Sequence, residues 1–433
     1  MRTTGWGRTN RANAKLISVS DPAVLAQKLA KSNSLTPAIP SGAGRSYGDQ
    51  ALSEKLWSSR RLNHFLGFDE QTGELSVEAG VSLGEIQRLF IPQGWALPVT
   101  PGTQYVTVGG AIANDVHGKN HHSFGTFGEH VTFLTLLRTD GALLHCSPTE
   151  NANLFHASIG GLGLTGFIVN AVIKLKPVRS GFVDSQTHSF TSLEDFWQIT
   201  DQSEAFEYTV SWVQIEKKRI RGLFNRANDH SSEQPEPLRS QSNLSVPFTP
   251  PISLFNRPSI KLMSEAYFRM GLGKQESALT HYQPFFYPLD QIANWNRAYG
   301  PKGFFQHQAV IPKDNAHEGL AELISAVQAS DQRSMVSVLK TTGKRTAPGL
   351  LTYPIEGVTL ALDFPNRGAA TLDLLKKLDA VTIAHGGRVN PSKDATMSAE
   401  TFKSSFGEKL LNEFNAMRDP GLQSQQSIRL LGK

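Results

Sequence analysis

The chain has 433 residues, of which 39% are hydrophobic and 19% are charged, and its net charge is +5. This composition excludes a disordered or fibrous protein, and the length predicts two domains of roughly 200 residues each. The one short basic run, at 217–219, is too small to predict a nucleic-acid-binding protein.

Cysteine occurs once, at Cys146, which excludes a disulfide framework and a metal site built from several cysteines. A single cysteine suits a reducing compartment, so a cytoplasmic protein is expected. The first residues lack an apolar segment and no run of about 18 apolar residues occurs, so neither a secretory signal nor a membrane span is predicted. Peripheral contact with the inner membrane stays open.

The first part of the chain alternates strands and helices. Asp21 and Pro22 predict the start of a helix, and Ser82 with Glu85 forms a capping box for a second helix that stops at Gly94. Strands are predicted at the start of the Gly-rich segment 37–51 and over 75–79, 131–138, 143–147 and 167–173.

Near Pro177 the sequence becomes less rich in glycine and more aromatic, which predicts a domain boundary there. A capping box at Thr191 and Glu194 predicts a helix. Residues 225–259 are rich in Ser, Asn and Pro and predict a long mobile loop. Further strands are predicted over 208–215, 303–311, 335–341 and within 351–362, and helices around 320–327, over 372–382 and, as a single last helix, over 402–414.

The stretch 101–131, called the central stretch below, contains six glycines, four histidines and Lys119, without an amphipathic period. Glycines leave amide N–H groups uncovered, and such groups bind phosphate oxygens. The central stretch is therefore predicted to lie against a ligand.

Residues 117–122 read HGKNHH. His117 and His121 have i, i+4 spacing, but Gly118 lies between them and no carboxylate follows at ligand spacing, so no metal is predicted. The favoured interpretation is the polar wall of an active site, to which His117 and Lys119 contribute. A structural loop is the alternative.

Other candidates are isolated polar or aromatic residues. Lys340 stands in an apolar, strand-like run, where a lysine is costly unless it is paired or functional. Alternation places Gln306 and Gln308 on one face, which suits hydrogen bonds to hydroxyls. Lys393, taken alone, predicts a surface ion pair with the neighbouring aspartate. Tyr299 fits a core role and a substrate-wall role equally well.

Gly161, Gly163 and Gly166 match the G-x-G-x-x-G spacing of a dinucleotide-binding loop. A strand, not a helix, is predicted after them, which argues against a Rossmann fold that binds a nicotinamide dinucleotide. We interpret the segment as a Gly-rich loop that enters a strand, with amides free to bind a cofactor.

Three Gly-rich segments follow one another in a fixed order, at 41–49 (SGAGRSYGD), 101–128 and 159–168 (IGGLGLTGFI). In this order they resemble the FAD-binding domain (PCMH type) of the vanillyl-alcohol-oxidase-like flavoproteins, and more narrowly the branch of that family that oxidises a lipid-linked ribose. The likeness begins with TGWGR near the N-terminus and continues through 295–301 and 363–365 to the loop of Lys393.

The resemblance implies an α+β fold with an FAD-binding domain at 1–178, a substrate domain with an antiparallel sheet at 179–385, and a C-terminal segment, 386–433, that returns to the FAD-binding domain. The residues that it places against the FAD are Gly42, Gly44, Arg45, Ser46, Tyr47, Pro101, Gly102, Thr103, Thr107, Gly109, Gly110, Ala113, Asn114, Val116, Gly161, Gly163 and Ile168. Relatives with covalent flavin often carry a histidine in the first Gly loop. This chain has none there, so non-covalent FAD is predicted.

The same resemblance implies functional side chains. The residues implied in catalysis are His117, Lys119, Tyr299, Lys340 and Lys393, and those implied in substrate binding are Tyr47, Trp212, Gln306 and Gln308. Mycobacterial members carry a cysteine, the target of covalent inhibitors, where this chain has Ala361. That class of inhibitors is therefore predicted to fail here, whereas catalysis should survive.

The implied reaction is FAD-dependent oxidation of the 2′-hydroxyl of a polyprenylphosphoryl-β-D-ribose to the 2′-keto sugar, the first half of epimerisation to arabinose in arabinan biosynthesis. A short-chain dehydrogenase partner would complete the epimerisation. The first alternative is an FAD-dependent oxidase of a soluble sugar alcohol or aldonolactone, since 216–290 matches the family only loosely. The second is a flavin-free glycan- or nucleotide-binding protein. The catalytic base and the electron acceptor, oxygen or a quinone, stay open.

Overall fold

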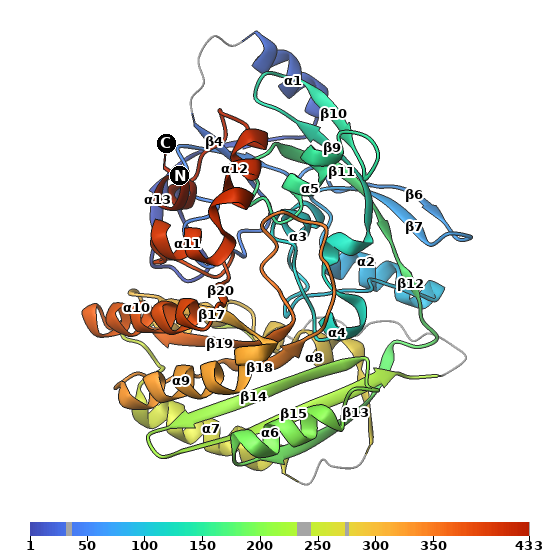
Figure 1. Ribbon diagram of the computed structural model, residues 1–433. Helices are drawn as coiled ribbons and strands as arrows, with labels where there is room; N and C mark the ends of the chain where they lie inside the picture. The colour runs from blue at the N-terminus through green and yellow to red at the C-terminus, as the bar shows by residue number, and fades with distance from the viewer. Residues whose placement is uncertain (32–36, 232–243, 273–276, 433) are drawn as a thin grey trace.

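The structure is a computed structural model that describes residues 1–31, 37–231, 244–272 and 277–432. In this part of the chain the strands form sheets of five, eight and three strands and two separate strand pairs. Figure 1 shows the N-terminal part above the large C-terminal sheet, with helices in both parts. The predicted α+β fold with two domains is confirmed.

The N-terminal sheet is antiparallel, in the order β10-β9-β11-β7-β6. Its strands are β6 (Phe65–Asp69), β7 (Glu74–Glu78), β9 (Val131–Leu137), β10 (Leu143–Cys146) and β11 (Phe167–Lys174). Leu75 and Val77 of β7 are fully buried and alternate with half-exposed residues, so one face of the sheet forms a core. The helices α2 (Leu83–Phe90) and α3 (Val108–Ala113) pack into that core. The predicted capping box of α2 is confirmed.

A small parallel sheet joins the two ends of the chain. Its strands are β3 (Lys15–Ser18), β5 (Lys55–Ser58) and β4 (Ala38–Ser41), and the strand pair β1 (Arg2–Thr4) and β2 (Arg11–Asn13) precedes it. The predicted helix at Asp21 is α1 (Pro22–Ala30). The helices α11 (Ala399–Phe406), α12 (Glu408–Met417) and α13 (Gln425–Leu431) share a core with the small sheet, so both termini lie side by side (Figure 1).

The large sheet is antiparallel, in the order β16-β13-β15-β14-β18-β19-β17-β20. Its strands are β13 (Phe182–Phe190), β14 (Tyr208–Glu216), β15 (Arg219–Asp229), β16 (Ala278–His281), β17 (Phe304–Pro312), β18 (Ser337–Thr342), β19 (Gly357–Pro365) and β20 (Arg388–Val389). The helices α6 (Leu193–Asp201), α9 (Ala316–Ala329) and α10 (Ala369–Ala384) bury one face of this sheet. The opposite face turns toward the N-terminal domain, except at the end that α7 (Arg257–Gly271) covers.

Several predictions for this second half are wrong in detail. The capping box of α6 is Ser192 with Asp195, one residue later than predicted. The loop predicted over 225–259 is shorter at both ends, because β15 continues its ladder with β13 to Asp229 and Asn256 caps the unpredicted helix α7. Residues 232–243 of that loop lie outside the described residues, so its mobility stays a prediction. The strand predicted within 351–362 is confirmed as β19, which begins at Gly357.

The last helix is also different from its prediction. Gly407 has φ 80°, a left-handed conformation that favours glycine, and it ends α11 and begins α12 in a new direction. The predicted single helix over 402–414 is therefore wrong. β20 still pairs with β17 of the large sheet, just beyond the predicted limit at 385.

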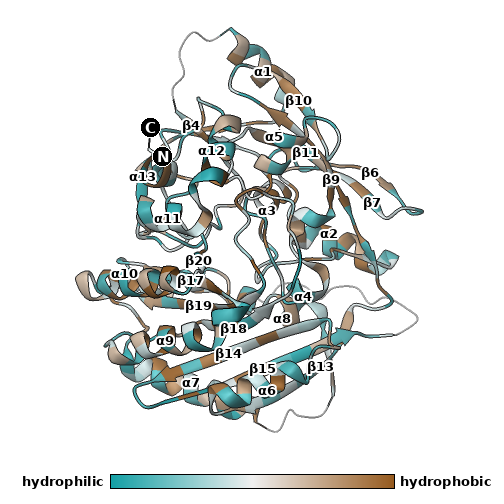
Figure 2. Ribbon diagram, viewed as in Figure 1, coloured by the Kyte–Doolittle hydropathy of each residue, from teal (hydrophilic) through white to brown (hydrophobic). Residues whose placement is uncertain are grey.

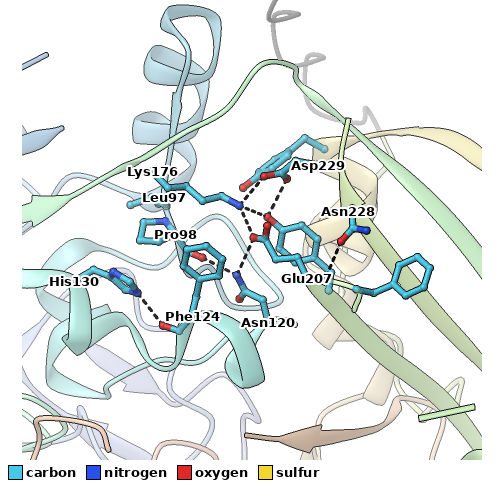
Figure 3. A network of polar contacts seen from close by, with 12 residues as sticks. Leu97, Pro98, Asn120, Phe124, His130, Lys176, Glu207, Asn228 and Asp229 are labelled. Atoms are coloured by element: carbon cyan, nitrogen blue, oxygen red, sulfur yellow. Dashed lines mark hydrogen bonds and ion pairs between the residues drawn. The ribbon is translucent and has the colours of Figure 1, made fainter. Parts of the chain in front are cut away.

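The connection between the two domains is fixed by a buried lysine. β12 (Lys176–Pro177) pairs with β8 (Trp95–Ala96), and Figure 3 shows the Lys176 amine among polar groups of the large sheet. Lys176 Nζ contacts Glu207, donates to Tyr208 Oη at 2.6 Å and lies 2.7 Å from Asp229 Oδ2. Asn120 of the central stretch donates to Glu207 Oε1 at 3.4 Å. We call these five residues the Lys176 cluster, and it holds the connection, the large sheet and the central stretch together.

Candidate active site

Four neighbouring strands of the large sheet present polar side chains toward the N-terminal domain. Their register places Gln308 of β17 opposite Ala361 of β19, Ala361 opposite Val338 of β18, and Val338 opposite Trp212 of β14. Residues two positions apart along a strand share a face. The face that we call the site wall therefore carries Trp212, Gln306, Gln308, Val338, Lys340, Thr359, Ala361 and Asp363.

The central stretch brings His117 and Lys119 to this wall. Beyond α3, an antiparallel bridge between His117 and Thr126 encloses the short helix α4 (His121–Phe124). The carbonyl oxygen of Lys119 accepts a hydrogen bond from the backbone N–H of Thr209 in β14, at 2.9 Å. Gly118 is required by its contact with the preceding loop, because a Cβ there would lie 2.9 Å from the backbone oxygen of Thr100.

Lys340 is buried at the centre of the site wall and is 7% exposed. Its Nζ lies 2.7 Å from His117 Nδ1 and also contacts the carbonyl oxygen of Gly118. Among the described residues no carboxylate forms an ion pair with it. Burial, with Lys119 as a second cause, lowers the pKa of Lys340 to about 7. Near neutral pH a large share of Lys340 is therefore a neutral amine.

A chain of hydrogen bonds assigns the same state to Lys340. The backbone N–H of Ser392 donates to Asn390 Oδ1 at 3.0 Å, so it is Asn390 Nδ2 that donates to Gln308 Oε1, at 3.0 Å. Gln308 Nε2 then donates to His117 Nε2, 3.2 Å away. A neutral imidazole that accepts at Nε2 carries its proton on Nδ1, so His117 donates to Lys340. An ammonium group cannot accept this bond. We call this chain the Asn390 relay.

The electrostatics of His117 agree with the relay. Burial, and then the neighbouring Lys340, hold the pKa of His117 well below its usual range, so the ring is neutral at physiological pH. Lys119 is close to the pair, and burial lowers its pKa to about 8. The Lys119 amine donates to the carbonyl oxygen of Phe285 at 2.6 Å and lies 5.0 Å from the centre of that ring.

A second cluster adjoins the relay through β17. Lys393 Nζ lies 4.3 Å from the centre of the Tyr47 ring, and Gln306 donates to the fully buried Asp363. Burial raises the pKa of Asp363 to about 7, whereas burial lowers that of Lys393 to about 8 against the opposing effect of Asp363. The predicted surface ion pair of Lys393 does not form, because Asp394 pairs with an arginine of α13.

Two predicted aromatic residues lie at the margins of the wall. Tyr299, at the end of η4 (Trp295–Tyr299), stacks on Phe304 with 4.1 Å between ring centres, and Tyr47 meets the same phenylalanine edge-on at 5.5 Å. Within the described residues the buried hydroxyl of Tyr299 has no hydrogen-bond partner. Trp212 makes an edge contact with Tyr267 of α7, at 5.0 Å between ring centres.

The glycines predicted to contact a cofactor differ in the space around them. Gly42 and Gly161 are required by the protein's own packing, because a Cβ would lie 2.2 Å from a threonine hydroxyl and 2.1 Å from a carbonyl oxygen. Gly44 and Gly102 have no described atom within 4 Å of a Cβ position. Open space above these two glycines lets a ligand approach the backbone.

Polar side chains of the Gly-rich loops are mostly bound within the protein. Asn114 Nδ2 donates to a backbone oxygen of α3 at 2.8 Å, and Thr103 Oγ1 donates to Asp290 Oδ1 at 2.8 Å. The guanidinium of Arg45 lies over the Trp6 ring, and its buried Nε has no partner among the described residues. Open glycines beside an arginine with an unbonded Nε fit a flat, phosphate-bearing cofactor such as FAD.

The other predicted cofactor residues surround these features. They lie in the first Gly loop (Ser46, Tyr47), in the central stretch (Pro101, Thr107, Gly109, Gly110, Ala113, Val116) and around the third loop (Gly163, Ile168). A cavity of about 440 Å³ opens next to the first loop and is lined by Arg45, Tyr105 and Thr107 together with two further arginines. Its cations suit a phosphate, and none of the relay residues lines it.

The histidines after His117 serve the fold. His121 Nδ1 accepts a hydrogen bond from the backbone N–H of Gly343 at 3.2 Å, and His122 Nε2 lies 2.8 Å from a backbone oxygen. Burial lowers the pKa of His121 to about 3. Over the described ranges, no group of three or more His, Cys, Asp or Glu residues is arranged to hold a metal ion.

Comparison with known proteins shows to which family this chain belongs. A family model described as an FAD binding domain matches residues 23–147. The decaprenylphosphoryl-beta-D-ribose oxidase of Mycolicibacterium smegmatis is 34% identical over 424 residues, covering 94% of this chain and 91% of that protein. This chain belongs to the decaprenylphosphoryl-β-D-ribose oxidase family. It is thus an FAD-dependent oxidoreductase, and a flavin-free binding protein is not favoured.

Other relatives match this chain over only part of its length. The Delta(24)-sterol reductase of Rattus norvegicus is 35% identical over 118 residues, which is 27% of this chain and 23% of that protein. The L-gulonolactone oxidase of Mus musculus is 32% identical over 139 residues, 31% of each chain. Likeness over these lengths is compatible with a shared FAD-binding domain on varied substrate domains.

Two polar residues of the site were not predicted from the sequence. Asn390 fixes the relay, and Asp363 accepts from Gln306, yet neither was predicted as a site residue. A carboxylate in the otherwise apolar run of β19 is the signal that marks Asp363. Asn390 carries no such signal, because its role arises from the pairing of β20 with β17.

Proposed function

We propose that this protein catalyses the FAD-dependent oxidation of the 2′-hydroxyl of a polyprenylphosphoryl-β-D-ribose to the 2′-keto sugar. The full-length likeness to the M. smegmatis oxidase supports this substrate class. The observation that carries the chemistry is the Asn390 relay, which ends at a buried lysine without a carboxylate partner among the described residues.

Oxidation of a secondary alcohol removes a hydride from carbon and a proton from oxygen. FAD, when bound, supplies the hydride acceptor. Lys340, as a neutral amine, accepts the hydroxyl proton, and the C–O bond becomes a carbonyl as the hydride leaves. Gln306 and Gln308 have the amide groups that orient sugar hydroxyls. Lys393, mostly charged below its pKa of about 8, stabilises the negative charge that develops.

The proposal also covers the mode of FAD binding, the partner enzyme and the place of the reaction. The first Gly loop, SGAGRSYGD, has neither histidine nor cysteine, which supports non-covalent FAD. The keto sugar requires a reductase to reach arabinose, and a short-chain dehydrogenase is the proposed partner. A cytoplasmic enzyme in peripheral contact with the inner membrane would meet a lipid-linked substrate.

The test is a visible spectrum of the purified protein, followed by anaerobic addition of polyprenylphosphoryl ribose. We expect a yellow protein whose flavin is released by acid precipitation and whose absorbance bleaches with this substrate. Bleaching by a soluble aldonolactone at micromolar concentration, with none by the lipid-linked ribose, would instead assign the enzyme to the soluble-substrate alternative. Flavin that stays in the precipitate would contradict non-covalent binding.

A further inference from the structure

The helix α7 presents three different faces. Ile260, Ser264 and Phe268 are buried against the large sheet. Arg257, Lys261 and Arg269, with Glu265, form a charged side. The third face is apolar and open, with exposed fractions of 72% for Leu262, 43% for Met263, 45% for Tyr267 and 69% for Met270. Met263, Tyr267 and Met270 have the i, i+4 and i+7 spacing of one helix face, with Leu262 next to Met263, and Figure 2 shows the mixture of apolar and polar residues along α7. We call these four residues the apolar stripe.

The apolar stripe begins at the site wall. Tyr267 contacts Trp212 edge-on, and Trp212 stands opposite Val338, two residues before Lys340 on the same face of β18. A single run of apolar side chains thus leads from the margin of the catalytic lysine to the outer surface of α7. A lipid chain attached to a substrate at the wall would meet this run first.

The segment before α7 in the sequence also exposes large apolar side chains. Its backbone is fixed to the chain around η4, since Leu254 N donates to Ala298 O at 2.8 Å and Val246 N donates to Ala293 O at 2.9 Å. Its large side chains are left outside, with Phe248 68% and Ile252 72% exposed. Large apolar side chains that gather on a protein surface mark interaction sites on soluble proteins.

We propose that the open face of α7, with Phe248 and Ile252, docks on the surface of a membrane that contains anionic lipids. The proposal rests on the lipid-linked substrate of the proposed function. An apolar stripe beside basic residues is the pattern of a helix that lies in the plane of a membrane surface. On α7 Arg257 pairs with Asp331 and Arg269 with Glu265, whereas Lys261 forms no ion pair with any of the described residues. Lys261 is exposed next to Leu262, and the chain as a whole carries a net charge of +5. In the described part of the chain, no helix is long and apolar enough to cross a membrane.

The experiment is sedimentation of the FAD-loaded protein with vesicles of phosphatidylglycerol and phosphatidylcholine, without substrate. We expect the wild type to bind, and the double variant Leu262→Ser, Met270→Ser to lose at least tenfold in vesicle affinity. Leu66→Ser is the matched control, because Leu66 is 52% exposed on the N-terminal sheet and should leave binding unchanged. Lys261→Gln should weaken binding several-fold and reduce its salt dependence.

The outcomes separate this proposal from the proposed function. Flavin reduction by a short-chain, water-soluble phosphoryl ribose should be the same in the wild type and in the double variant, because neither leucine nor methionine lies on the site wall. Docking is overturned if the wild type does not sediment with vesicles, if the double variant binds as well, or if the stripe holds two copies of the protein together instead. Failure of flavin reduction in every variant would overturn the proposed function and leave the vesicle result to stand by itself.

Discussion

Lys176 and Lys340 are both buried near the domain interface, and their surroundings differ. Lys176 is bound by two carboxylates and a tyrosine hydroxyl, so its charge is compensated within the Lys176 cluster (Figure 3). Lys340 has a neutral histidine and a backbone oxygen as its partners. Burial without a compensating charge lowers the pKa of Lys340 to about 7.

The difference shows how one residue type serves two purposes. A buried lysine with carboxylate partners holds segments of the chain together, whereas one without them becomes an amine that can exchange a proton. Lys176 should therefore matter for stability and Lys340 for chemistry. Each prediction below tests one side of this comparison.

The largest effect is expected for Lys340→Met. Loss of the proton acceptor should slow flavin reduction by about 10³-fold, the range typical of a removed general base, while FAD stays bound. Anaerobic stopped-flow reduction with the lipid-linked ribose measures this rate. Lys344→Met is the matched control, since Lys344 is exposed four residues further on and should change nothing. A Lys340→Met enzyme that is reduced at the wild-type rate would remove Lys340 from the chemistry.

Lys176→Met should act on stability instead. It leaves Glu207 and Asp229 facing each other without their cation, and we expect the free energy of unfolding to fall by roughly 3 kcal/mol. Urea denaturation of the FAD-loaded enzyme measures the change. Lys313→Met, which breaks an exposed pair with Glu356, should cost less than about 0.5 kcal/mol. Equal effects of the two variants would contradict the structural role of the cluster.

The pH dependence of flavin reduction provides a third test. Below its pKa of about 7 Lys340 is increasingly protonated and cannot accept a proton, so the rate should fall about tenfold per pH unit on the acid side and level off between about pH 7 and 8, above which Lys393 loses its charge. The residual flavin reduction of Lys340→Met should not show this decrease at acid pH. A rate that instead falls as the pH rises through 7 would show that the charged form of Lys340 is the active one.

The smallest effect is expected for Asn390→Asp, which tests a positioning residue. Aspartate can still accept from the backbone N–H of Ser392 but can no longer donate to Gln308 Oε1. The Gln308 amide is then free to turn and the relay no longer favours the neutral amine, so the midpoint of the pH profile should rise by about one unit. Asn390→Ala removes the same hydrogen-bond donor without adding a negative charge, and it should reduce the rate of flavin reduction. An unchanged midpoint in Asn390→Asp would show that the relay does not set the state of Lys340.

Local signals in the sequence were sufficient for much of the fold. Caps at Asp21 and Ser82 and alternation along β7 and β17 depend on neighbouring residues, and the elements appear where these signals predict them. These local signals failed where the composition of a segment did not indicate the strand or helix that it forms. Ser, Asn and Pro around 225–259 concealed the end of β15 and the start of α7, and Gly407 divided a helix whose apolar spacing looked continuous.

By itself, the sequence predicted, through its resemblance to a flavoprotein family, that three Gly-rich loops lie against a flavin, and it showed that Lys340 is out of place in an apolar strand, because both signals reside in residue type and local order. The tertiary structure decided which groups meet. Pairing of β20 with β17 brings Asn390 to Gln308, and the crossing of the central stretch brings His117 to Lys340 over a separation of more than two hundred positions. Protonation depends on such contacts and on the loss of water around them, and neither is written in the order of neighbouring residues.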